Sequence, residues 1–176
     1  MITTPPILKT ERLILRGFEA NDFQSVANMW ADEDVVRFIG FSRTPQDAWF
    51  ASIRVRGMWP VLGFGYWIVT ERETGAFLGE TGFADFKRGM TPDLSIHPEA
   101  GWAFAKAAWG KGYATEAVTA THKWLDANLP GPSQCIMDPE HNGSRRVAEK
   151  VGYTFMSESL YGDNPVNIMH REPQPS

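Results

Sequence analysis

The alternation of apolar and polar positions along the chain predicts about seven strands. In "RLILRGF" (12–18) apolar and basic residues alternate, which is typical of a strand that is buried on one face. A turn at Glu73-Thr74-Gly75 separates two further apolar runs and predicts a hairpin. The strands predicted in this way cover residues 12–18, 65–71, 76–86, 99–105, 133–137, 154–160 and 166–170.

Apolar residues three and four positions apart predict four helices between these strands. A capping pair, Asn21-Asp22, precedes the first helix, and Pro45 takes the first position of the second, where its fixed backbone angle suits a helix. The spacing of the second helix is predicted to turn Trp49 and Ile53 toward the core. The four helices begin near residues 23, 45, 112 and 142.

The order of these elements is β-α-α-β-β-β-α-β-α-β-β, which predicts a mixed α/β (α+β) fold. The early strands favour antiparallel pairing, and the later β-α-β units favour crossovers. The pattern runs from Leu13 to Met169 without a linker, and 176 residues with 43% hydrophobic content are enough for one core. We therefore expect a single domain over residues 1–176.

Composition narrows the class of partner. A net charge of −4 argues against a nucleic-acid-binding protein, which usually carries a basic face. The one cysteine, Cys135, cannot form a disulfide within the chain, and no apolar run reaches membrane-spanning length or resembles a signal peptide. No HExxH, CxxC or carboxylate cluster indicates a metal. The expectation is a cytoplasmic protein without nucleic-acid, membrane or metal partners.

One segment, "AKAAWGKGYATEA" (105–117), places Gly110-Lys111-Gly112 directly before a predicted helix. The first N–H groups of a helix are unpaired and bind anions, and glycines let the backbone approach a phosphate closely. A P-loop would need glycine at Ala105, and a dinucleotide-binding fingerprint would need glycine at Thr115. Both patterns fail, so a different kind of phosphate-binding loop is predicted.

The chain resembles the GNAT superfamily of N-acetyltransferases, in particular its RimJ/RimL-like branch. The resemblance rests on "TERLILR", "EAGWAFAKAAWGKGYATEAV" and "NGSRRVAEKVGYTF", in the order of the family. It implies a GNAT-type, mostly antiparallel sheet of about seven strands flanked by four helices. It also implies direct transfer of an acetyl group from acetyl-CoA to a primary amine, either a protein N-terminus or a small molecule. A homodimer is an expectation of the same kind.

The resemblance further implies which residues hold acetyl-CoA. The glycine-rich loop would donate backbone N–H groups to the pyrophosphate, and the backbone of the strand before it would pair with the pantetheine arm. In the third motif the family's asparagine position holds His141, with Asn142 one residue later. The cofactor-binding residues implied are Ala103, Phe104, Ala105, Trp109, Gly110, Lys111, Gly112, Tyr113, Ala114, His141, Asn142 and Ser144.

Catalysis requires a neutral amine, and a lysine amine needs about 3.5 kcal/mol more than an α-amine to lose its proton at a given pH. Glu99, where relatives often hold a glutamate, is the first candidate for the general base, and Glu80 is the second. The position of the tyrosine acid of some relatives holds Ala148. Trp59 and Trp67 are candidates to line an acceptor pocket. The alternative functions are a non-catalytic acyl-CoA sensor and, on the glycine-rich loop alone, a nucleotide-binding module.

Overall fold

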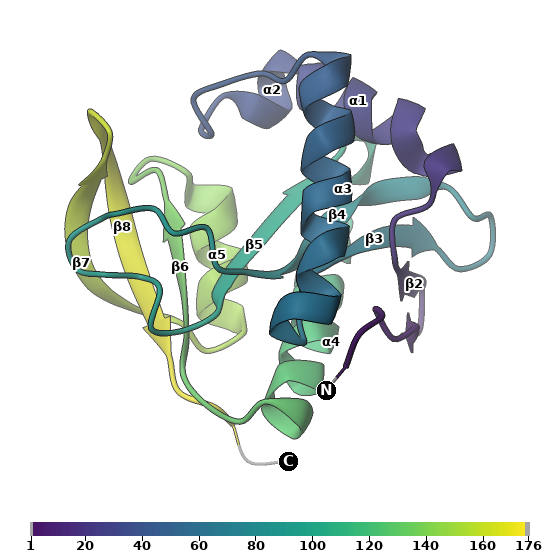
Figure 1. Ribbon diagram of the computed structural model, residues 1–176. Coiled ribbons are helices and arrows are strands. Elements are labelled where there is room, and N and C mark those ends of the chain that lie inside the picture. Colours follow the sequence, from purple (N-terminus) through teal and green to yellow (C-terminus); the bar gives the residue numbers. More distant parts are fainter. Residues whose placement is uncertain (1, 175–176) are drawn as a thin grey trace.

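The computed structural model describes residues 2–174 and consists of one eight-stranded sheet with helices on both faces (Figure 1). The strand order is β1-β2-β3-β4-β5-β6-β8-β7, and all neighbours are antiparallel except β5 and β6. The strands are β1 (Leu8–Lys9), β2 (Leu13–Arg16), β3 (Tyr66–Glu71), β4 (Phe77–Ala84), β5 (Glu99–Phe104), β6 (Ser133–Met137), β7 (Thr154–Tyr161) and β8 (Asn164–Arg171). The helices are α1 (Phe23–Ala31), α2 (Glu33–Val36), α3 (Pro45–Leu62), α4 (Tyr113–Asn128) and α5 (Asn142–Lys150).

The mixed α/β class and the mostly antiparallel sheet are confirmed, and the described chain contains one strand and one helix more than expected. The extra strand, β1, has two residues, which is too short for a periodic pattern. The extra helix, α2, has four residues and begins where the side chain of Asp32 accepts a hydrogen bond from the backbone N–H of Asp34. Both elements are too short for hydrophobic periodicity to reveal.

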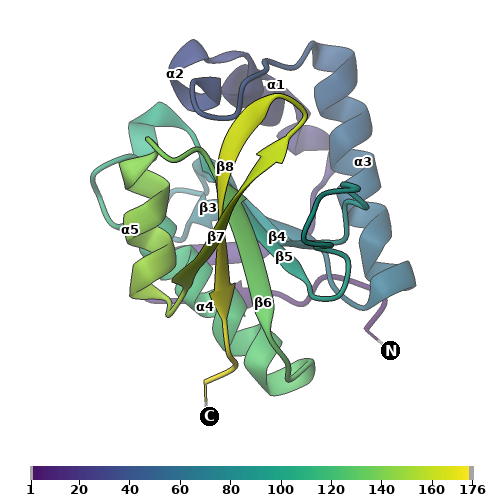
Figure 2. The ribbon, with the colours of Figure 1, turned by 90° about the vertical axis from the view of Figure 1, so that its left-hand side faces the viewer.

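Helices α1 and α3 lie on one face of the sheet, and α4 and α5 lie on the other (Figures 1 and 2). Helix α3 approaches the sheet through small residues, Ala48, Ala51 and Ser52, and through the buried Trp59 near its C-terminal end. The prediction that Ile53 faces inward is wrong, because this side chain is 46% exposed. One residue past Ser52 is a rotation of about 100° around the helix, which takes Ile53 off the buried stripe.

Three tryptophans form the centre of the larger core. Trp59 and Trp67 are fully buried, with ring centroids 4.6 Å apart, and both meet Trp124 of α4 edge-on at 5.3 and 5.1 Å. Trp59 lies in the last turns of α3 and Trp67 belongs to β3, so both are core residues. Trp67 also lines a small cavity beside Glu80, and a role of either residue at an acceptor pocket stays a prediction.

The parallel strands β5 and β6 touch at only one register position, Glu99 opposite Gln134. Beyond that point they diverge, as Figure 2 shows, while β5 stays paired with β4 along its whole length. The second edge of β5 from Gly101 to Phe104 is thus not paired with a described strand, although the Phe104 carbonyl accepts a hydrogen bond from the Trp109 indole at 2.8 Å. In the gap where β5 diverges from β6, the Trp102 side chain reaches α5. Among residues 2–174, no helix is long and apolar enough to cross a membrane.

Candidate active site

The glycine-rich loop connects a short 3-10 turn (Lys106–Ala108) to α4 and is exposed. Gly110 and Gly112 have φ angles of 73° and 79°, which residues with a side chain rarely adopt. The N-cap of α4 is Gly112, and no side chain caps the helix. The first N–H groups of α4 therefore face solvent without a side-chain acceptor, which is the arrangement that binds phosphate groups.

Arg12, near the other end of the sequence, holds this loop in place through hydrogen bonds. It was not among the residues predicted from the sequence. Its Nη1 donates to the carbonyl of Lys111 at 2.8 Å, its Nε donates to Glu116 at 2.7 Å, and its guanidinium lies 4.7 Å from the ring centre of Tyr113. Thr10 also donates to Glu116, at 2.6 Å. The "TERL" segment carried the signal, since a threonine and an arginine precede the apolar run, but it was used only to predict a strand and to support the family resemblance.

The residues expected to contact the pantetheine arm lie on the two sides of the gap between β5 and β6. Ala103 and Phe104 belong to β5, Ala105 follows it, and Asn142 and Ser144 lie in the first turn of α5. The Trp102 indole spans the gap and donates to the Ser144 hydroxyl at 3.1 Å.

His141 caps α5 by accepting a weak hydrogen bond from the Ser144 N–H at 3.4 Å. Its ring stacks on Phe38 with centroids 4.5 Å apart, and burial lowers the pKa of His141. His141 is therefore a neutral ring at the edge of the gap at neutral pH. That His141 or Asn142 takes the place of the family's asparagine stays a prediction.

On the α1/α3 face of the sheet, Tyr66 lies across two glycines. Gly82 and Gly101 are opposite each other on β4 and β5, and Tyr66 of β3 is opposite Gly82. A Cβ at Gly101 would lie 2.1 Å from the Tyr66 hydroxyl oxygen, and one at Gly82 would lie 2.5 Å from the Tyr66 Cα. Only glycines at both positions allow this tyrosine to reach β5.

The hydroxyl of Tyr66 has no hydrogen-bond partner within the described part of the chain and lies over the strand whose second edge is open. Burial raises the pKa of Tyr66, and the nearby carboxylates of Glu99 and Glu80 raise it further, so the phenol stays protonated at neutral pH. Tyr66 was not among the residues predicted from the sequence. The signal was the pair of glycines inside two predicted strands, because an interior glycine often marks the close approach of another group.

Glu99 is buried and closed in an ion pair. Arg88 donates to its two oxygens through Nε and Nη2, each at 2.8 Å, and Glu99 is 4% exposed. Arg88 comes from the loop between β4 and β5 and also lies 4.7 Å from the ring centre of Phe86 and 4.6 Å from that of Tyr161. A carboxylate with both oxygens bonded to a guanidinium is fixed in orientation, and both of its oxygens already accept N–H donors.

Glu80 is equally buried, at 6% exposure, but in residues 2–174 it has no ion pair. Its one side-chain hydrogen bond comes from the indole N–H of Trp30, at 3.1 Å. Burial raises the pKa of Glu80, and the charge of Arg43 and the Trp30 hydrogen bond only partly oppose this. A carboxylate with a raised pKa is a stronger proton acceptor, which is what a general base requires.

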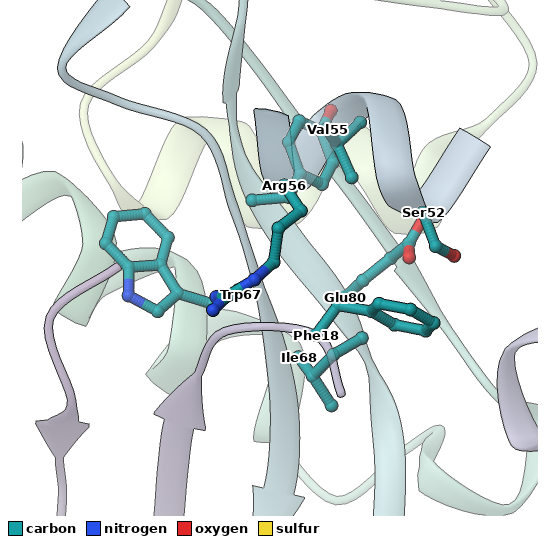
Figure 3. Close-up of a pocket in the computed structure, with 8 residues that line it drawn as sticks. Phe18, Ser52, Val55, Arg56, Trp67, Ile68 and Glu80 are labelled. Atoms are coloured by element: carbon teal, nitrogen blue, oxygen red, sulfur yellow. The ribbon is translucent and has the colours of Figure 1, made fainter. Parts of the chain in front are cut away.

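A cavity of about 10 Å³ lies between α3 and strands β3 and β4, and Figure 3 shows Glu80 extending toward Ser52 at its edge. Tyr66 and Arg56 also line it. This volume is about what a single water molecule needs, and the lining offers polar partners. The cavity therefore has room for one water molecule between the side chains of Glu80 and Tyr66.

Cys135 and His122 are both buried in the core. Cys135 is buried, and burial raises the pKa of its thiol, so it is not a nucleophile at neutral pH. Burial lowers the pKa of His122 to about 4, and its ring bonds to the Val118 carbonyl and the Tyr153 hydroxyl on the other face of the sheet. The described residues contain no group of three or more His, Cys, Asp or Glu side chains that could hold a metal ion.

Comparison with known proteins agrees with this geometry. Residues 12–154 match the model of the acetyltransferase (GNAT) domain. YkkB, an uncharacterized protein of Bacillus subtilis (strain 168), is 27% identical over 168 residues, which cover 94% of this chain and 95% of YkkB. A protein of Bordetella pertussis described as a GnaT-family acetyltransferase has a TM-score of 0.83 at 28% identity, covering 94% of this chain and 99% of that one. An acetyltransferase of Agrobacterium tumefaciens str. C58 has a TM-score of 0.81 at 26% identity, with 95% and 94% covered.

Structures at 9–14% identity include acetyltransferases of ribosomal proteins and of spermidine, and at that distance they show the fold alone. The RimJ/RimL-like branch therefore stays a prediction. The domain model covers most of the chain, so the protein belongs to the GNAT acetyltransferase family.

Proposed function

We propose that the protein is an acetyl-CoA-dependent N-acetyltransferase that passes the acetyl group directly to a primary amine. The observation that carries the proposal is the exposed loop with Gly110 and Gly112 in the left-handed conformation, leading into the uncapped α4 beside the open edge of β5. The loop offers backbone N–H groups to a pyrophosphate, and the open edge offers backbone groups to an extended amide chain. The residues proposed to hold acetyl-CoA are Ala103, Phe104, Ala105, Trp109, Gly110, Lys111, Gly112, Tyr113, Ala114, His141, Asn142 and Ser144.

Acetyl-CoA would supply the thioester, and the chain's own residues would move the protons. Glu99 was the first candidate for the base, but its pairing with Arg88 supports a positioning role instead. Glu80 is better suited, because it is buried, unpaired and has a raised pKa. In the proposed reaction Glu80 takes a proton from the amine, and the Tyr66 hydroxyl donates one toward the departing sulfur. The small cavity that both residues line leaves room to return the proton to Tyr66 through water.

The acceptor class, the cytoplasmic location and a homodimer remain predictions. Acceptor contacts are expected from residues 32–60, 85–98 and 161–166. The first two of these segments supply Arg43 and Arg88, and the charges of both act on Tyr66. Both kinds of acceptor, a protein N-terminus and a small molecule, agree with membership of the family. The acyl-CoA sensor is the alternative, and binding without turnover on any amine would favour it.

The test is calorimetric titration of acetyl-CoA into the wild type, Gly112→Asp and Gly75→Asp. Gly75 has a positive φ of 73°, like Gly112 at 79°, but lies in the β3–β4 turn, so it controls for backbone strain. A Cβ would meet nothing within 4 Å at Gly75 and only Arg12 Nη2, at 3.4 Å, at Gly112. We expect acetyl-CoA to bind the wild type and Gly75→Asp, and Gly112→Asp to lose binding through repulsion of the phosphates. A wild type that does not bind acetyl-CoA contradicts the proposal. Thiol release with a panel of amines then separates an enzyme from a sensor.

A further inference from the structure

Arg43 is a cation that the fold holds in place without a charged partner. Its guanidinium carbon lies 3.5 Å from the ring centre of Trp30, and its backbone N–H donates to the Trp30 carbonyl at 3.1 Å. In the part of the chain that the structure describes, its side chain forms neither a hydrogen bond nor an ion pair. Guanidinium groups away from solvent normally pair with a carboxylate or a phosphate, because their five N–H donors otherwise lose hydrogen bonds to water.

The surroundings of Arg43 show that this charge is not compensated. Burial lowers the pKa of Arg43, and neighbouring Arg54 lowers it further. Glu80, Tyr66 and Asp47 act in the opposite direction from a distance, without a direct contact. The side chain is therefore partly desolvated beside a second arginine, a position that an anion would stabilise.

The same indole connects Arg43 to the proposed base. The face of Trp30 carries the guanidinium of Arg43, while its ring N–H donates to Glu80 at 3.1 Å. A proton acceptor and an anion-binding group are thus fixed on one rigid side chain, one at its edge and the other on its face. When an acceptor amine gives its proton to Glu80, the acceptor atoms a few bonds from the amine nitrogen lie on the side of Arg43.

We propose that the acceptor site selects amines that carry an anionic group close to the reacting nitrogen, such as the α-carboxylate of a free amino acid. The inference rests on the proposed acetyltransferase function and names its substrate class. A planar guanidinium can bind both oxygens of a carboxylate at once, which fixes the orientation of the acceptor. Polyamines and the amines of lysine side chains lack such a group, and an additional positive charge near Arg43 is repelled.

The test compares matched acceptors in an assay of thiol release from acetyl-CoA. Glycine, alanine and methionine are each paired with the corresponding amide, and O-phosphoethanolamine is paired with ethanolamine to distinguish a phosphate from a carboxylate. An uncharged amide makes the amine less basic and easier to deprotonate, so this bias works against the proposal. We expect kcat/KM of the anionic member of a pair to be at least about tenfold higher.

Arg43→Met keeps an unbranched chain over Trp30 and removes the charge. Because the charge of Arg43 also acts on Glu80, both acceptors can change, but kcat/KM of the anionic acceptor should fall about ten- to a hundredfold more than that of the neutral one. Arg54→Gln removes an exposed charge nearby and should keep the preference. Because an unpaired, partly buried charge contributes little to stability, Arg43→Met should not lower the melting temperature, whereas a purely structural cation–π contact would.

Equal rates for the two members of each pair, an equal loss for both in Arg43→Met, or a preference for an amidated peptide with a free N-terminus each overturn the proposal. If no amine is acetylated, the proposed function fails, and the anion site is then judged by binding alone. In that case methionine and methioninamide are titrated calorimetrically into the wild type and Arg43→Met. Binding of methionine that only Arg43→Met loses sustains the site, and its absence overturns it.

Discussion

Glu80 and Glu99 are two buried carboxylates on the same face of the sheet, and their partners differ. Their strands are paired so that Glu80 is opposite Ala103 and Glu99 is opposite Ala84, with Tyr66 between them. Arg88 closes on both oxygens of Glu99, whereas Glu80 receives a single hydrogen bond from an indole. Both carboxylates are buried, so the proposed assignment of Glu80 as the general base rests on the difference in their partners.

The elements that carry the two arginines explain the difference. Arg88 belongs to the loop between β4 and β5, and this loop packs Met90 and Leu94 against β8. The Arg88–Glu99 pair thus joins a packed loop to the sheet. Arg43 is held on Trp30 instead and does not reach Glu80 with a hydrogen bond.

The largest effect is expected from Glu80→Gln, which should lower kcat by about 10²- to 10⁴-fold. The amide keeps the size of the side chain and can still accept from Trp30, but it cannot take a proton. Affinity for acetyl-CoA, measured by calorimetry, should not change, because in the proposed reaction the Glu80 side chain contacts the amine and not the cofactor. Glu99→Gln provides the comparison, and its folded fraction should lose much less activity. Equal losses in the two variants would mean that the two carboxylates do not differ as proposed.

Glu99→Gln should instead have its main effect on stability. It leaves the Arg88 guanidinium, 17% exposed, without its anion, and an uncompensated charge of this kind costs about 3–5 kcal/mol of unfolding free energy. Urea unfolding measures this loss. Replacing both partners, Glu99→Leu with Arg88→Met, should recover most of it. If Glu99→Gln unfolds like the wild type, the ion pair does not join the loop to the sheet.

A side chain at position 101 would push against Tyr66, the tyrosine between the two carboxylates. Gly101→Ala places a Cβ 2.1 Å from the Tyr66 hydroxyl, and such overpacking costs about 1–3 kcal/mol. In a Tyr66→Phe background the nearest ring atom is 3.2 Å away, so the same substitution should cost much less. A double-mutant cycle on unfolding free energy measures the difference, and Gly131→Ala, in open space, is the control. Additive losses would show that Tyr66 does not lie across Gly101.

The sequence predicted the features that depend on nearby residues. Alternation over a few positions identified all strands longer than two residues of the described chain, and glycines before a helix located the loop that is proposed to bind phosphate. These signals are local because strand periodicity and helix termini depend on neighbouring residues. Ile53 was misplaced because α3 contacts the sheet through Ala48, Ala51 and Ser52, and small residues give little periodic contrast.

The sequence did not predict the parts of the candidate site that depend on distant residues. Tyr66 meets Gly101 only through the registers of β3, β4 and β5, and Arg12 meets Lys111 across the fold. Glu80 ranked below Glu99 for the same reason. Nothing near either residue in the sequence indicates that Arg88 would pair with Glu99 and leave Glu80 unpaired.

The smallest effect expected is the pH dependence of stability at Glu80. Its pKa is raised in the folded state, so the folded protein binds the proton more tightly than the unfolded chain. Between the ordinary glutamate pKa and the raised one, stability therefore falls as pH rises, by at most about 1.4 kcal/mol per pH unit. Glutamine resembles the protonated carboxyl at every pH, so the stability of Glu80→Gln relative to the wild type should improve as pH rises from 4 to 7.

Glu116→Gln is the control with the opposite sign. Burial acts to raise the pKa of Glu116, but hydrogen bonds from Thr10 and Arg12 hold it below the ordinary range. The carboxylate of Glu116 therefore contributes stability above the ordinary glutamate pKa, and this contribution is lost as pH falls through the lowered one. Urea unfolding from pH 3 to 7 should show Glu116→Gln losing stability relative to the wild type where Glu80→Gln gains it. The same slope for both variants would mean that the environment of Glu80 does not favour the protonated form, and its role as the base would lose its electrostatic support.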